Sequence, residues 1–125
     1  MRKPINYQSL LWSESKTTPG VRYAIRRISL GQRLELTRRA RELSLEHDFL
    51  KAGSIGEQME ASLSDLLVER LYLEWGLAEI DGLKVDGEAA TPTTLIEKGP
   101  ELLAREALAS IQAELGLSDD ERKNS

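Results

Sequence analysis

The stretch WGLAEIDGLKVDG, residues 75–87, interrupts a chain that otherwise has the pattern of charged helices. It contains three glycines and two Asp-Gly pairs. The pair at 81–82 lies between two short apolar runs, which predicts a β-hairpin, because both central positions of a type I′ turn need a positive φ. Gly76 is predicted to cap the preceding helix in a left-handed conformation, and the pair at 86–87 to make a second turn.

Helices are predicted on both sides of this ribbon. Apolar residues at helical spacing predict one helix over 30–52 and a second over about 55–75. Downstream, Thr91-Pro92 begins a short helical turn, and a last long helix covers about 100–115. Gly116 is predicted to cap that last helix.

Two local signals organise the residues before the first helix. Residues 21–25, VRYAI, alternate with a period of two, which predicts a short strand with one solvent-exposed face. Ser29 and Gln32 form a capping-box pattern, which predicts that the first helix begins at residue 30.

The expected fold is therefore mainly α. It is a three-helix compact domain over residues 20–117, with a short N-terminal strand and a small β-hairpin between the second and last long helices. Residues 1–19 are predicted to form a flexible N-terminal arm, and residues 118–125 a charged C-terminal tail.

Charge is distributed unevenly along the 125 residues, although the net charge is only −4. Residues 20–41 carry a net charge of +6, whereas residues 42–125 carry −12. This asymmetry is typical of nucleic-acid binding or of steering between protein surfaces. The alternative is that the two blocks pair within one fold, and the sequence leaves these readings open.

Motifs of known catalytic and metal sites are absent from the sequence. It has no cysteine, no Gly-rich phosphate loop, and no HExxH or GxSxG element. Its one histidine, His47, is expected at the edge of the core rather than at a metal or in catalysis. We therefore expect no enzyme activity, metal or cofactor. No run approaches the ~20 apolar residues that cross a bilayer. We therefore expect a cytoplasmic location and no membrane partner.

A second interpretation concerns DNA. Residues 30–53 resemble the opening of a repressor-type helix-turn-helix. That family usually has a glycine where Glu42 stands, and its recognition helix is polar or basic, whereas SIGEQMEASLSD is acidic. Because phosphates repel acidic side chains, a helix-turn-helix DNA-binding protein is kept as an alternative and nucleic acid is not an expected partner.

From residue 21 onward the order of features resembles phage tail assembly chaperones, small proteins encoded among phage tail genes. The stretches that carry the resemblance are YLEWGL (72–77), IDGLKVDG (80–87), TPTTLIEKGPELLAREALASI (91–111) and LSDDERKNS (117–125). They form a pattern of helix, glycine ribbon and helix rather than a catalytic signature.

The resemblance implies a non-enzymatic assembly factor in the cytoplasm of the host bacterium. Such a factor covers the hydrophobic helices of the tape measure protein until tail tube subunits polymerise around them. A small structural or adaptor subunit of the phage particle is the alternative that the residues leave open.

Two sets of contact residues follow from this interpretation. The residues expected to face the partner lie on the second helix, with ordinary core packing as their alternative: Leu67, Leu71, Tyr72 and Trp75. Arginines of the basic segment are expected to meet the acidic block of a neighbouring copy in a homo-oligomer: Arg22, Arg26, Arg38 and Arg39.

Overall fold

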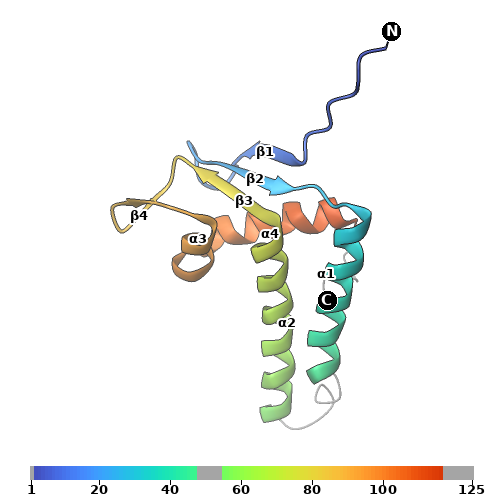
Figure 1. The fold of residues 1–125 in the computed structure, drawn as a ribbon. Helices are drawn as coiled ribbons and strands as arrows, with labels where there is room; N and C mark the ends of the chain where they lie inside the picture. The colour runs from blue at the N-terminus through green and yellow to red at the C-terminus, as the bar shows by residue number, and fades with distance from the viewer. Residues whose placement is uncertain (1, 48–54, 117–125) are drawn as a thin grey trace.

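The computed structural model describes residues 2–47 and 55–116. In chain order the elements are β1 (Leu10–Glu14), β2 (Arg22–Arg26), α1 (Leu30–His47), α2 (Ile55–Gly76), β3 (Leu77–Asp81), β4 (Lys84–Val85), β5 (Glu88–Ala89), α3 (Pro92–Lys98) and α4 (Glu101–Leu115) (Figure 1). The described residues thus form four helices and two small antiparallel sheets, a mixed α/β arrangement. The expected fold is confirmed in part: a β-hairpin lies between α2 and α4, but the described residues contain four helices and a three-stranded sheet in addition to the hairpin.

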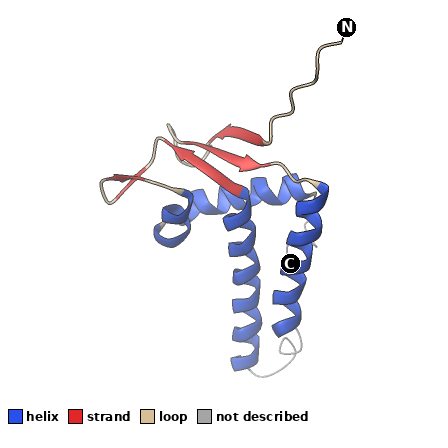
Figure 2. Ribbon diagram, in the orientation of Figure 1, coloured by secondary structure: helices blue, strands red, loops and turns tan. Residues whose placement is uncertain are grey.

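The helices lie on one side of the larger sheet, whose strand order is β1-β2-β3 (Figure 2). α4 runs beneath this sheet, and α1 and α2 project from it side by side (Figure 1). The hydroxyl of Tyr23 on β2 lies 3.0 Å from the hydroxyl of Ser110 on α4. The central strand is therefore fixed to the helix below it.

One core joins the sheet to the helices. α4 contributes a row of residues at helical spacing, and the other buried side chains come mainly from β2, α1 and α2: Val21, Tyr23, Ile25, Leu36, Ala40, Val68, Leu71, Tyr72, Leu103, Ala107, Leu108, Ile111 and Leu115. The exposed face predicted for the strand at residues 21–25, which corresponds to β2, is only partly confirmed. Arg22 and Arg26 are exposed, but Ala24 between them is buried because Trp12 and Glu79 flank it on the neighbouring strands.

Three predicted helix ends are confirmed. The hydroxyl of Ser29 accepts a hydrogen bond from the N–H of Gln32 at 3.2 Å, at the start of α1. The hydroxyl of Thr91 caps α3, and Gly116 ends α4 in the left-handed region with φ 75°. The predicted end of the first helix at residue 52 and the charged tail at 118–125 lie outside the described residues.

The β-hairpin forms at the second Asp-Gly pair, so the prediction for the first pair is wrong. β3 ends at Asp81 and pairs with β2, not with β4. β4 pairs with β5, and the turn between them has positive φ at both Asp86 (53°) and Gly87 (83°), as a type I′ turn requires. β3 pairs instead with the central strand, which offers it a longer ladder than the two residues of β4.

Gly76 is not a left-handed cap, which corrects a second prediction. α2 ends at Gly76 and β3 begins at the next residue, so no loop separates them. A Cβ atom on Gly76 would lie 2.8–2.9 Å from three side-chain carbons of Ile111, which is itself completely buried. Glycine is therefore required here for the close approach of α4 to the junction of α2 and β3.

The ordered sheet begins inside the segment that was predicted to be an arm. Residues 10–14 form β1 and pair with β2 along their whole length. The turn after β1 is held by Glu106 of α4, whose carboxylate accepts hydrogen bonds from the hydroxyl of Ser15 (2.8 Å), the N–H of Lys16 (2.9 Å) and the hydroxyl (2.6 Å) and N–H (3.1 Å) of Thr17. Of the described part of the predicted arm, residues 2–9 precede the strand, with a bend at Ser9.

We predict that Gly76→Ala destabilises the protein, although alanine is the better helix former. The added methyl group would overlap Ile111, and overpacking of a core costs about 1–3 kcal/mol, more than the ~1 kcal/mol gained in helix propensity. Gly31→Ala is the matched control, because Gly31 lies in α1 with no atom within 4 Å of an added Cβ. Chemical denaturation should give a lower free energy of unfolding for the first variant and an equal or higher one for the second.

Glu106 also predicts a pH dependence. Partial burial alone would raise the pKa of this carboxyl, but the hydrogen bonds from residues 15–17 outweigh it and lower the pKa from 4.5 to about 2. A depressed pKa contributes stability above the unfolded-state value, and this contribution is lost as pH falls from about 4.5 to about 2. Glu106→Gln should lower the free energy of unfolding near neutral pH by about 1–3 kcal/mol, because hydrogen bonds to a charged group are lost.

The difference between Glu106→Gln and the original chain should shrink between those two pH values, as measured by denaturant titration. A difference that stays constant with pH would contradict a role for the ionised carboxylate.

Candidate functional site

The half of α2 far from the sheet has α1 beside it and no other described element over it (Figure 1). A helix in such a pair is covered on one side only. Met59, Leu63 and Leu66 lie on the uncovered side and are 68%, 45% and 51% exposed. Their spacing of four and three residues places them in one stripe along the helix.

This stripe leads into a groove between three helices. Leu66 lines both a shallow hollow of about 420 Å³ over the stripe and a second cavity of about 190 Å³ between α2, α3 and α4. The apolar lining of the second cavity is Leu66, Leu73, Ile96, Ala104 and Leu108. We call the stripe and this cavity together the α2 groove.

The positions of the α2 groove on its long helix follow a heptad pattern. Residues 59, 63, 66, 70 and 73 alternate steps of four and three, which is the spacing of a coiled-coil seam. Leucine or methionine occupies every one of these positions except the fourth, which is Arg70. A seam of this kind accepts the side chains of a second helix between its own.

Charged side chains form the rim of the cavity. Arg70 binds Glu74 at 2.7 Å within α2 and also Glu97 on α3, and Arg105 of α4 binds Glu69 of α2 at 2.5 Å. Exposed ion pairs stabilise a fold by only ~0–1 kcal/mol each. Two of these pairs also link separate helices at the rim, α2 to α3 through Arg70 and α2 to α4 through Arg105.

The predicted partner-facing residues lie mostly on the other side of α2. Leu71 and Tyr72 belong to the buried core, which is the alternative that the sequence left open for them. Leu67 is half-buried, and Trp75 packs against the core, where its indole N–H has no hydrogen-bond partner among the described residues. The exposed stripe was missed, although its heptad spacing is visible in the sequence.

Three of the four predicted self-association arginines have contacts within the chain. The guanidinium of Arg22 lies 4.9 Å from the ring centre of Trp12, and Arg26 donates to the backbone carbonyl of Trp75 at 3.0 Å. Arg39 is exposed on α1.

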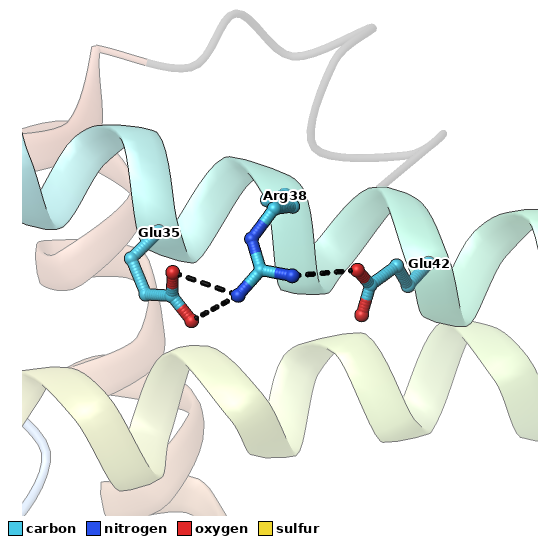
Figure 3. A network of polar contacts seen from close by, with 3 residues as sticks. All are labelled: Glu35, Arg38 and Glu42. Carbon is cyan, nitrogen blue, oxygen red and sulfur yellow. Dashed lines mark hydrogen bonds and ion pairs between the residues drawn. The ribbon is translucent and has the colours of Figure 1, made fainter.

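Arg38, also on α1, binds both carboxylate oxygens of Glu35 at 2.7 and 2.9 Å and one of Glu42 at 2.9 Å (Figure 3). The hydrogen bond from Arg38 lowers the pKa of Glu35. Self-association through the four arginines stays a prediction.

Other predicted sites can be placed only in part. The side chain of His47 lies outside what the structure describes. Within residues 2–47 and 55–116, no three metal-ligating side chains come together, and no helix there is long and apolar enough to cross a membrane. α1 and α2 lie side by side, whereas the helices of a helix-turn-helix cross steeply.

Comparison with known protein families, curated proteins and solved structures finds no match.

Aspartate substitutions should distinguish the α2 groove from the core. Leu63→Asp adds a charge at an exposed site, so the free energy of unfolding should change by less than about 1 kcal/mol. Leu71→Asp buries an unpaired charge and should cost more than about 3 kcal/mol or prevent folding. Circular dichroism during urea unfolding measures both, and equal losses would show that Leu63 is also part of the core.

Proposed function

We propose that this protein is a non-enzymatic phage tail assembly chaperone that holds hydrophobic helices of the tape measure protein in the α2 groove. The observation that carries the proposal is the exposed apolar stripe at heptad spacing, which ends in a cavity between three helices. Partner helices bind such grooves through anchors at i, i+3, i+4 and i+7. In this proposal the protein works in the cytoplasm of the host bacterium and binds neither nucleic acid nor membrane.

The dimensions of the α2 groove support temporary rather than permanent binding. The α2 groove from Met59 to Leu73 spans about 21 Å of helix, roughly four turns of a partner. Contacts over so short a length bind weakly, and Met59 can adapt to different apolar side chains. A long tape measure helix would therefore need several copies of the protein, each of which tail tube subunits can displace.

Charge supports the proposal from another direction. The acidic block that contains α2 carries a net charge of −12 over residues 42–125. A chaperone covered with like charge keeps its complex in solution while the apolar segment of the client is buried. The charged rim beside the apolar stripe is suited to an amphipathic helix rather than to a wholly apolar one.

The α2 groove can be tested by co-expression. The protein is produced together with a helical fragment of the tape measure protein encoded beside it, and the soluble fraction of the fragment is measured. The double variant Met59→Asp/Leu63→Asp should bind the fragment at least about tenfold more weakly, because two apolar anchors are lost.

Leu34→Asp is the matched control for this experiment. It introduces the same charge at an exposed leucine of α1 and should leave binding unchanged. Equal loss of binding in both variants, or binding that neither variant affects, would contradict the α2 groove as the binding site.

The competing role, a structural or adaptor subunit, gives the opposite result in purified phage particles. A chaperone should be absent from them by mass spectrometry, whereas a subunit should be present in fixed proportion to the tail proteins. Detection of this protein in purified particles in such a fixed proportion would overturn the proposed function.

A further inference from the structure

β1 has an open edge. It is an outer strand of the sheet, and β2 is the only strand paired with it among the described residues. The backbone carbonyl of Ser9 and the N–H of Ser15 form hydrogen bonds on the β2 side, at 2.9 and 2.8 Å. Because backbone groups alternate in direction along a strand, the N–H and C=O groups of Leu10, Trp12 and Glu14 point outward. Such an edge is a template for one more strand.

Residues 2–9 have the properties of such a strand. They lie past the end of β2 and leave the body of the molecule before a bend at Ser9, which pairing with a second copy would straighten (Figure 1). Ile5 is 94% exposed on this segment, an unfavourable position for a large apolar side chain. Tyr7 is 64% exposed, and within its own copy its ring centre lies 5.7 Å from the guanidinium of Arg27. Arg2 and Lys3 give it a positive charge, whereas the one charged residue of β1 is Glu14.

We infer that residues 3–8 of one copy pair antiparallel with the free edge of β1 in a second copy, and that the second copy does the same in return. The result is a symmetric dimer in which one sheet runs through both copies. The occupant of the edge is thus this chain itself. The inference does not depend on the proposed function, because neither the segment nor β1 touches the α2 groove.

The alternating direction of the backbone N–H and C=O groups along each strand allows a register in which the two-fold axis of the dimer passes beside Ser9. In this register Ser9 of one copy lies opposite Ser9 of the other. Because the backbone groups of Ser9 point toward β2, the two Ser9 residues form a pair that is not hydrogen-bonded. Tyr7 faces Leu11 of the other copy, and Leu11 is 37% exposed at the edge of the helix-covered face, so two exposed apolar side chains cover each other. Pro4, which has no N–H, falls at the end of the ladder, where one missing bond matters least.

The charges agree with this register. Glu14 of one copy lies opposite Pro4 of the other and diagonal to Arg2, which is within reach of long side chains. Lys3 is the next residue along the same segment. Opposite charges at diagonal positions favour antiparallel pairing, and the basic segment would be repelled by its own kind in a parallel arrangement.

Because the chain has no cysteine, a single introduced cysteine reports the pairing directly. Ser9→Cys places two thiols opposite each other in a pair without intervening hydrogen bonds, close enough for a disulfide. Ser13→Cys is the matched control on the same strand. In the same register the two cysteines at position 13, one in each copy, lie eight residues apart along the strand direction, which is about 26 Å.

Under mild oxidation, Ser9→Cys should give at least about tenfold more disulfide-linked dimer than Ser13→Cys, because only the first pair meets the distance limit. Light scattering of the original chain should show a dimer, and deletion of residues 2–8 should shift it to monomer while circular dichroism stays unchanged. A monomer at all concentrations, a dimer that survives the deletion, or equal cross-linking of the two variants would overturn the inference.

Discussion

The contact of the Gly76 backbone with the side chain of Ile111 is the constraint on which the arrangement of helices and sheet depends. It lies where α2 turns into β3 without a loop, directly against the C-terminal half of α4. A helix can cross this junction so closely only because position 76 has no Cβ. The contact brings Leu77 at the start of β3 into the same buried core as Ile111. As a result, one helix packs against both the sheet and the helix pair.

The exposed stripe is a consequence of that packing. α4 crosses α2 at its sheet end, and α3 adds cover beside it, so Leu73 is buried. α4 cannot also cover the far half of α2, because it continues beneath the sheet toward Tyr23. Met59, Leu63 and Leu66 continue the same helix face beyond the covered part and stay exposed. The chain therefore has one apolar face of α2 that changes from core to surface along its length.

Local patterns in the sequence predict where the helices lie, but they do not predict which elements pack or pair with one another. The caps at Ser29, Thr91 and Gly116 are found because each depends on a few adjacent residues. Pairing of β3 with β2 was missed because Asp81-Gly82 and Asp86-Gly87 have the same turn chemistry. The choice between them depends on a strand that lies fifty or more residues earlier in the chain.

The candidate site shows the same limit. The periodicity of α2 reveals apolar residues on much of its circumference, and a period alone does not say which face a distant helix covers. The sequence therefore leaves both a partner contact and core packing open for Leu71 and Tyr72, and in the structure both lie in the core, where α2 packs against α1, β2 and α4. The reason for Gly76 was missed for a related cause. A glycine after a helix has the same local appearance whether it adopts a left-handed cap or admits a neighbouring side chain.

The open edge of β1 and the exposed stripe of the α2 groove lie at different ends of the molecule, so one protein can use both surfaces at once. The edge belongs to the sheet, whereas the exposed stripe lies on the helix pair that projects from it (Figure 1). A dimer joined through β1 would leave both grooves open and hold them at a fixed separation. Two weak sites on one rigid body bind a long helix more tightly than either site alone, since the second contact becomes intramolecular. Edge pairing would thus strengthen the hold on a long helical client without any enlargement of the short groove on each copy.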